Sequence, residues 1–300
     1  MNMTEQEKVA AKKISRIMRA ARKQLALTQE QVAKKLGISQ SALSKLEHGT
    51  LVASAPQWFD FCELTGIPAD SLKSGYIDLE TKAVVEDGNR KGTFKLPRKY
   101  ANNRTVKIRE LLPVMRFIEV QFGEDKLLDF FRISKMDEDF FIHLDNQVNL
   151  DFRIDLFKFL AQQGVSLPES MLMIAAGAGR PDGHGNFRRK LDGLKQPADF
   201  VKTWVQSSRL YNCDLNYKIE NESASYIDVS ITPESTFPTE KLTSDPAMTQ
   251  VLCEYVRSYI ESLARYGTDL EKLKSAGKKV KQLESLQLGH NRGLYRLELP

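Results

Sequence analysis

The chain has 300 residues, of which 41% are hydrophobic and 28% are charged, and its formal net charge is +5. Single cores rarely exceed about 250 residues, so this length favours two domains. No apolar run reaches the roughly 18 residues that span a bilayer, and the N-terminus lacks the apolar region of a signal peptide, so we expect no membrane association. The cysteines Cys62, Cys213 and Cys253 are odd in number and widely spaced, which predicts buried thiols in a reducing cytoplasm rather than disulfides or a metal site.

A first helix is expected over roughly residues 6–24, and residues 28–49 predict two short helices joined by a tight turn. Thr28 can cap the first of these two helices, and Gln31 completes a capping box. Gly37 supplies the left-handed residue that ends this helix. The pattern therefore predicts a sharp change of chain direction near residue 37.

The second short helix covers residues 39–47 and begins with Ser39 as its cap. Leu43 and Leu46 fall on its inner face at helical spacing. Its outer face carries Gln40, Ser41, Ser44 and Lys45. Amide, hydroxyl and ammonium groups can read base edges or hold phosphate oxygens, and a helix after such a turn is the element that enters the DNA major groove. This segment therefore predicts double-stranded DNA as a partner.

A further helix begins near Ser54 and Pro56 and ends at Gly66. We expect its apolar side chains to face the core; they are Trp58, Phe59, Phe61 and Leu64. The first 72 residues are thus expected to form an all-α domain.

The matched motifs of this domain are Leu27-Thr28-Gln29, Val32-Ala33, Leu36-Gly37-Ile38-Ser39, Leu43-Ser44 and Leu46-Glu47-His48-Gly49. With these motifs, residues 11–72 resemble the Cro and lambda-repressor-like (XRE) helix-turn-helix family over its whole five-helix domain. The resemblance implies a homodimer that binds operator DNA and an ion pair between Arg22 and Glu47. Two features depart from the family pattern: Ala26 replaces a frequent glycine, and the loop 50–53 lacks the usual Lys and Pro.

The resemblance also implies roles for individual side chains of this domain. Gln29 would hold a phosphate or order the recognition helix, and base contacts would come from Gln40, Ser41 and Lys45. Contacts to the DNA backbone would come from the region of Ser44 and His48. The expected DNA-binding residues are therefore Gln29, Gln40, Ser41, Ser44, Lys45 and His48.

Residues 73–109 form a polar, glycine-containing connector, and residues 73–110 hold 10 Lys+Arg against 5 Asp+Glu. Its basic residues, which could add phosphate contacts or could belong to a solvated linker, are Arg90, Lys91, Lys95, Arg98 and Lys99. The connector could tether the first domain flexibly or pack along the second, and the sequence leaves both alternatives open.

Residues 110–300 change from helical to strand periodicity along the chain. Helices are expected before residue 206, including one capped by Asn146 and one begun by Pro197. Alternation then predicts strands at 211–219 and 227–231, a helix that begins at Asp245-Pro246, and final strands near 268–275, 278–288 and 294–299. We therefore expect a multi-domain chain: a five-helix domain at 1–72, a linker, and at 110–300 an α+β domain whose antiparallel sheet is covered by helices.

This order of elements loosely resembles heme-nitric-oxide-binding-associated and 4-vinyl-reductase-type sensor domains. The resemblance implies a small-molecule ligand or a role in dimerisation for residues 110–300. The cysteine cluster of some members is absent, so no metal or thiol chemistry and no cofactor is expected.

Evidence for an enzyme is weak in this sequence. The glycine-rich loop 177–185 lacks the Gly-Lys-Ser/Thr of a P-loop and is expected on the surface. Asp182 and His184 within it are too few for a metal site, whereas His143 is expected at a helix end in the core and His290 in a solvated turn. Self-cleavage is also disfavoured, because Ser170 precedes the Ala-Gly bonds that it would have to follow.

Two functions of different classes remain open from the sequence. One is a transcription regulator whose helix 39–47 reads operator DNA and whose second domain dimerises or senses a ligand. The other is a protein-interaction scaffold that kept the helix-turn-helix fold without operator binding.

Overall fold

The computed structural model describes residues 4–79, 94–180, 184–234, 240, 244–268, 279–285 and 290–299. The chain divides into two compact units: unit 1 comprises Met1–Pro97 and Phe131–Asn146, and unit 2 comprises Arg98–Phe130 and Gln147–Pro300. The predicted C-terminal domain began at residue 110, whereas unit 2 begins at Arg98. The chain also returns to unit 1 between Phe131 and Asn146. Among the described helices, none is long and apolar enough to cross a membrane.

In its described residues, unit 1 contains five α-helices and one 3₁₀ helix that the returning segment contributes. They are α1 (Glu5–Gln24), α2 (Gln29–Lys35), α3 (Gln40–Glu47), α4 (Ala55–Thr65), α5 (Ser71–Ser74) and η1 (Glu138–Ile142). Thr28, Ser39 and Ser54 cap helices as predicted, each through its side-chain oxygen. Gly37 has a φ of +64°, which confirms the predicted left-handed turn between α2 and α3.

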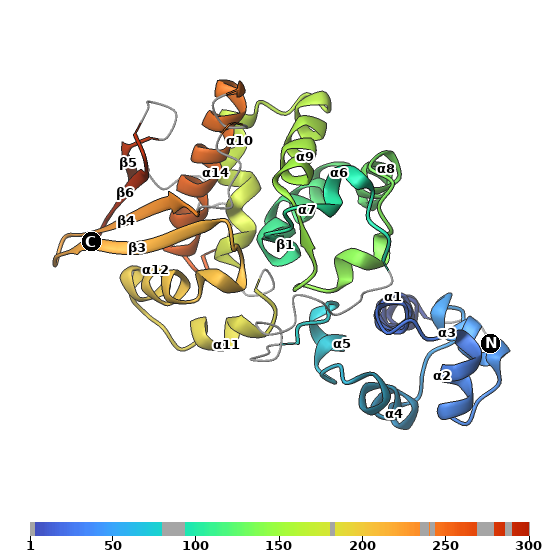
Figure 1. The fold of residues 1–300 in the computed structure, drawn as a ribbon. Helices are drawn as coiled ribbons and strands as arrows, with labels where there is room; N and C mark the ends of the chain where they lie inside the picture. Colours follow the sequence, from blue (N-terminus) through green and yellow to red (C-terminus); the bar gives the residue numbers. More distant parts are fainter. Residues whose placement is uncertain are drawn as a thin grey trace. The chain divides into compact units, whose positions relative to one another are not determined.

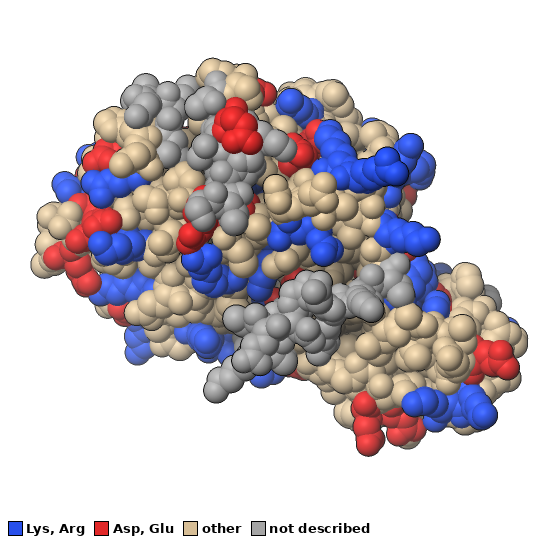
Figure 2. Space-filling model, in the orientation of Figure 1, with Lys and Arg blue, Asp and Glu red and all other residues tan. Residues whose placement is uncertain are grey.

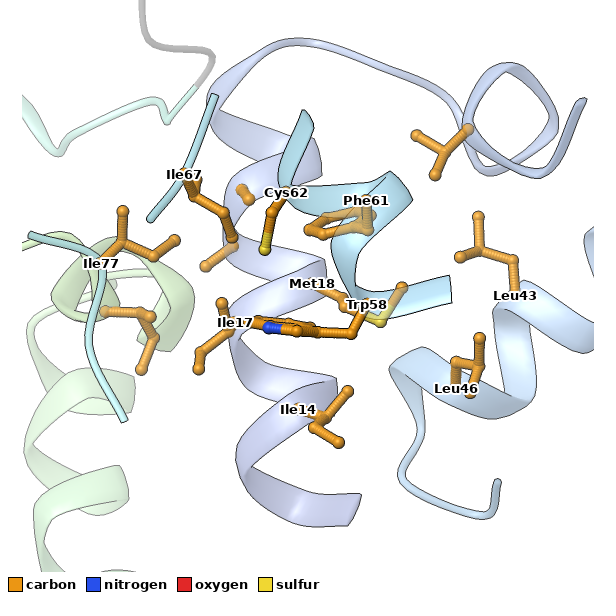
Figure 3. Close-up of a cluster of buried hydrophobic side chains, with 14 of the residues drawn as sticks. Ile14, Ile17, Met18, Leu43, Leu46, Trp58, Phe61, Cys62, Ile67 and Ile77 are labelled. Carbon is orange, nitrogen blue, oxygen red and sulfur yellow. The ribbon is translucent and has the colours of Figure 1, made fainter. Parts of the chain in front are cut away.

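The core of unit 1 lies between α1, α3 and α4 (Figure 3). The side chains labelled there are Ile14, Ile17, Met18, Leu43, Leu46, Trp58, Phe61, Cys62, Ile67 and Ile77. Trp58 also donates its indole N–H to the Ala69 carbonyl oxygen at 3.1 Å. Phe59 was expected in this core but is 59% exposed, because it lies two positions from the fully buried Phe61 and therefore nearly on the opposite face of α4.

The returning segment Phe131–Asn146 is attached to α1 by ion pairs. Arg19 lies 2.6 Å from both Glu138 and Asp139, and Lys23 lies 2.8 Å from Asp137 and 2.6 Å from Asp139. Asp139 is 1% exposed and faces both cations. A buried carboxylate needs such partners, so this run of acidic residues is part of the fold of unit 1.

Unit 2 begins with helices and short strands. In chain order they are α6 (Arg98–Ala101), β1 (Val106–Lys107), α7 (Ile108–Phe122), α8 (Glu124–Ile133), whose last turn enters unit 1, β2 (Gln147–Val148), α9 (Leu150–Gln162), α10 (Leu167–Ala175), η2 (Ala176–Gly179), η4 (Gly185–Phe187), α11 (Arg188–Leu191), α12 (Pro197–Gln206) and η5 (Ser208–Leu210). The cap of α9 is Asn149 rather than the predicted Asn146, because residues 147–148 pair as β2 with β1.

The sheet of unit 2 contains β3 (Leu215–Glu222), β4 (Tyr226–Pro233), β5 (Val280–Glu284) and β6 (Gly293–Glu298). Its strands are antiparallel in the order β3-β4-β6-β5, and α12 and α14 (Pro246–Leu263) pack against it (Figure 1). The predicted α+β class with an antiparallel sheet and covering helices is confirmed. The strand expected from residue 211 begins at Leu215, because η5 ends at Leu210 and the Asn212 side-chain oxygen then accepts from the backbone N–H groups of Asp214 and Leu215 in a turn.

Ile227, Val229 and Ile231 of β4 are buried as the alternation predicted, but Asp228 and Ser230 are buried too, so burial itself does not alternate along this strand. Asp228, between them in sequence, accepts from Arg296 on β6 at 2.7 and 2.9 Å. The expected strand 268–275 lies outside the described residues apart from Thr268.

Candidate nucleic-acid interface

The outer face of α3 carries the polar residues that the sequence analysis selected. Gln40, Ser41, Lys45 and His48 are exposed, and Ser44 is half-buried. On the inner face Leu43 and Leu46 are fully buried. The fold therefore presents these side chains to solvent on a helix that is anchored from behind, and their contact with DNA stays a prediction.

A chain of hydrogen bonds connects the interior of unit 1 to α3. Arg22 binds both carboxylate oxygens of Glu47, at 2.5 and 2.8 Å, which confirms the expected ion pair. Gln29 donates its amide to Glu47 at 2.9 Å, and Gln40 donates to the amide oxygen of Gln29 at 3.0 Å. Glu47 is 1% exposed, so the chain starts from a fixed, buried carboxylate.

The carboxylate of Glu47 determines which group donates and which accepts in this series of hydrogen bonds. A carboxylate only accepts, so Gln29 must turn its NH₂ group toward it and its oxygen toward Gln40. Gln40 then uses one N–H on Gln29 and keeps a carbonyl oxygen and a second N–H. That donor and acceptor pair matches the N6 and N7 edge of adenine in the major groove. Gln29 thus contacts α3 through Gln40, and both roles expected for it stay predictions.

His48 lies at the C-terminal end of α3 and contacts Ser44. Its Nδ1 lies 2.7 Å from the Ser44 carbonyl oxygen and 3.4 Å from the Ser44 hydroxyl. A carbonyl oxygen only accepts, so Nδ1 carries the proton and caps the helix end. In the neutral ring Nε2 is then an acceptor, so donation to a phosphate requires the protonated ring.

The loop 50–53 after α3, which lacks the Lys and Pro usual in the family, presents apolar side chains to solvent. Thr50 closes the helix by donating its backbone N–H to the Lys45 carbonyl oxygen at 3.0 Å. Leu51 and Val52 are 40% and 36% exposed, where a cation would be suited to phosphate. Figure 2 shows basic and acidic side chains interspersed on the face drawn there, so a DNA partner is inferred from α3 rather than from a uniformly basic surface.

The basic residues of the connector 73–109 do not share one environment. Arg90 and Lys91 lie outside the described residues, and Lys95 and Arg98 are exposed. Lys99 lies 2.5 Å from Asp155. Its charge is therefore paired within unit 2.

The glycine-rich loop is not a surface loop over its described part, which corrects the sequence-based expectation. Ala176–Gly179 forms η2, and His184 is fully buried. His184 Nε2 lies 2.6 Å from the Ala178 carbonyl oxygen, and Nδ1 lies 2.6 Å from the Tyr211 hydroxyl. Nε2 is thus the protonated nitrogen and Tyr211 donates to Nδ1, which makes His184 a core residue; Asp182 lies outside the described residues.

The other histidines are placed as predicted. His143 is 5% exposed at the end of η1, with its ring centroid 6.4 Å from that of Phe94. His290 is exposed. Cys62 and Cys253 are buried and Cys213 is half-buried; all three are free thiols, and burial raises the pKa of Cys62 to about 11. Among the described residues, no group of three or more His, Cys, Asp or Glu is arranged to hold a metal.

Sequence reasoning missed a buried ionic group in unit 2. Glu110 lies 2.6 Å from Arg153 and accepts from Asn212 at 2.6 Å. Burial raises the pKa of Glu110, and the charge of Arg153 opposes this shift. Tyr255 donates to the backbone oxygen of Glu110 at 2.9 Å. The group is enclosed and its carboxylate oxygens are satisfied, so it supports the core; an arginine on the apolar face of α9 was the available signal.

Comparison with known proteins identifies the N-terminal fold. Residues 18–72 match the helix-turn-helix family model HTH_3, which supports a DNA-binding regulator of the XRE type. No curated protein matches the chain significantly. Among solved structures, the Fe(II) unliganded H-NOX protein from K. algicida and a mutant of it each match at 11% identity and a TM-score of 0.43, covering 65% of this chain and 97% of theirs.

Proposed function

We propose that this protein is a sequence-specific transcriptional regulator that binds operator DNA through α3. The observation that carries the proposal is the exposed polar face of α3, within a segment that matches a helix-turn-helix family. Gln40, Ser41 and Lys45 would contact bases, whereas Ser44 and His48 would contact the phosphate backbone.

The hydrogen-bond chain supports a specific role for Gln29 and Gln40. A glutamine that is fixed before binding loses less side-chain entropy in the complex than a freely rotating one. Gln29 would thus fix the amide plane of Gln40 against one base pair, and adenine is the base that fits its remaining donor and acceptor.

We propose that the regulator acts as a homodimer. Two copies of α3 would then occupy half-sites about 34 Å apart, or a multiple of this distance, on a palindromic operator. Unit 2 would dimerise the chain or sense a small ligand. A ligand would change operator affinity only by the difference between its affinities for the two conformations.

A protein-interaction scaffold is the second candidate function. The exposed Leu51 and Val52 beside α3 favour it, because apolar side chains at this place suit a protein surface better than phosphate. The two functions differ in their dependence on DNA sequence.

Selection from random DNA with the full-length protein, at near-physiological salt, tests the proposal. Gel shifts on the selected site should show that Gln40→Ala costs about 1–3 kcal/mol on the specific site, and that Lys45→Ala weakens binding and lowers the salt dependence. Lys73→Ala, at an exposed lysine outside α2 and α3, is the control and should bind as the parent does. Selection that enriches no sequence, or a Gln40→Ala variant with unchanged preference, would refute operator reading and favour the scaffold.

A further inference from the structure

Arg19 of α1 contacts three acceptors that come from two distant parts of the chain. Its Nε donates to Asp139 at 2.6 Å, and its Nη2 donates to Glu138 at 2.6 Å. Its Nη1 donates to the backbone carbonyl oxygen of Glu47 at 3.4 Å. A guanidinium is planar and its donors point in fixed directions, so this one side chain connects the returning segment to the last residue of α3.

The carboxylates determine where the guanidinium of Arg19 lies. The side chain of Asp139 is 1% exposed, and that of Arg19 is 25% exposed. The two bonds to carboxylates join opposite charges and are shorter than the bond to the Glu47 carbonyl oxygen, so they dominate. The position of Arg19 beside the end of α3 therefore follows from the acidic residues of the returning segment.

These acidic residues are themselves fixed to unit 1. Asp137 caps η1, because its side chain accepts from the backbone N–H of Asp139 at 3.0 Å. Ile77 donates its backbone N–H to the Ile142 carbonyl oxygen at 2.8 Å and accepts from the Leu144 N–H at 3.0 Å. Ile77 and Ile142 also belong to the hydrophobic core of unit 1. The returning segment is thus a fixed support for the guanidinium.

The end of α3 is the place where this support acts on the reading face. The last carbonyl groups of an α-helix have no partner within the helix, and a cation near them is favourable. Arg19 binds the backbone of Glu47, while Arg22 binds its carboxylate at 2.5 and 2.8 Å. Gln29 donates to the same carboxylate, and Gln40 donates to Gln29. A displacement of Glu47 would therefore change the orientation of Gln40.

We propose that Arg19 is a positioning residue for operator reading, and that it makes the recognition helix depend on residues 131–146. The proposal rests on the proposed function, in which Gln40 reads a base. The supporting segment lies outside residues 18–72, which match the helix-turn-helix family. Because Phe130 and Gln147 belong to unit 2, the chain joins this support to unit 2 at both of its ends.

Arg19→Lys separates positioning from stability. The ammonium group can pair with Asp139 and Glu138, but lysine lacks the separate Nη1 that reaches Glu47. On the operator selected above, full-length Arg19→Lys should lose about three- to tenfold in affinity, whereas its affinity for unrelated DNA should stay that of the parent. Arg104→Lys, at an exposed arginine of unit 2, is the control and should bind as the parent does. Unchanged operator affinity in Arg19→Lys would overturn the proposal.

A double-mutant cycle distinguishes positioning from a general weakening of unit 1. If Arg19 acts through Gln40, Arg19→Lys should have little further effect on operator affinity in a Gln40→Ala background. Losses that simply add would show that Arg19 does not act through Gln40, and they would overturn the positioning role.

The returning segment is tested by two substitutions of its acidic residues. Asp139→Asn should lower operator affinity at least as much as Arg19→Lys does. Glu138→Gln, at a side chain that is 44% exposed, should keep the fold and lower operator affinity about threefold. Glu63→Gln, at an exposed glutamate of the same unit, is its matched control. Equal operator affinity in Glu138→Gln and Glu63→Gln would overturn the dependence on residues 131–146.

Amide hydrogen exchange tests the same contact without DNA. The backbone N–H groups of His48 and Thr50 donate to carbonyl oxygens of α3 at 3.0 Å. In Arg19→Lys both should exchange about threefold faster, whereas the Gly66 N–H, which donates to Cys62 at the end of α4, should not change. Unchanged exchange at the end of α3 would overturn the positioning role. If selection enriches no DNA sequence, the proposed function is refuted, and faster exchange would still support the attachment of α3 through Arg19.

Discussion

Substitution of Glu47 tests both the stability of unit 1 and the orientation of Gln40. Glu47 is 1% exposed and is held by Arg22 and Gln29 at 2.5 to 2.9 Å. Glu47→Gln would turn an NH₂ group toward one of these donors and leave the guanidinium of Arg22 without a carboxylate. Breaking a buried pair in this way costs about 3–5 kcal/mol. With an m-value of about 1–3 kcal/mol/M, the urea midpoint of unit 1 should fall by roughly 1–5 M.

The distribution of tryptophans makes this measurement specific. The chain has two tryptophans, Trp58 in unit 1 and Trp204 in unit 2, and both are buried. Urea unfolding in a Trp204→Phe background therefore reports on unit 1 through Trp58 fluorescence. The control is Glu63→Gln, at an exposed glutamate of the same unit, which should leave the midpoint unchanged.

A double substitution separates stability from orientation. Arg22→Met with Glu47→Leu removes both charges together, and apolar replacement of a buried pair is often neutral. The double variant should therefore regain most of the lost stability. It has no carboxylate to fix Gln29 and Gln40, so operator affinity should remain reduced. The reasoning is wrong if Glu47→Gln unfolds like the parent, or if the double variant binds the operator as tightly as the parent.

Three further predictions concern single positions. Ala26 has a φ of +57°, so Ala26→Gly should stabilise unit 1 by about 0.5–1 kcal/mol in the Trp58 assay, and an unchanged midpoint would contradict this reasoning. A Cβ on Gly179 would lie 2.5 Å from the Ser262 carbonyl oxygen, so Gly179→Ala should lower the melting temperature of unit 2 by about 5 °C. Gly193→Ala, with open space around its Cβ, should not change it, and equal losses would count against a clash. Hydrogen bonds from its arginine partner lower the pKa of Asp228, so this residue stabilises the fold above the ordinary carboxyl pKa, and the contribution is lost as pH falls through the lower folded pKa. Asp228→Asn should therefore destabilise unit 2 at neutral pH, and urea unfolding should show this difference narrowing as the pH falls through and below the ordinary Asp pKa of 3.8. A difference that is independent of pH would rule out the ion pair as its cause.

The sequence determined the local structure of unit 1 because the signals lie a few residues apart. The caps Thr28, Ser39 and Ser54 bond to backbone groups within their own first turns, so residue type and spacing were sufficient. The outer face of α3 followed from the helical period once Leu43 and Leu46 were placed inside. Alternation in β4 was equally local, and it placed Ile227 and Val229 in the core.

Only the tertiary structure decided which distant segments meet. The ion pair of Arg19 with Asp139 spans 120 positions and lies within unit 1, to which residues 131–146 belong. The burial of His184 and the pairing of Glu110 with Arg153 likewise depend on contacts between remote elements. Periodicity shows which face of an element is apolar, but it does not show which partner covers that face. That choice follows from the combined packing and hydrogen bonding of the whole unit, because each buried polar group must meet its partner in space.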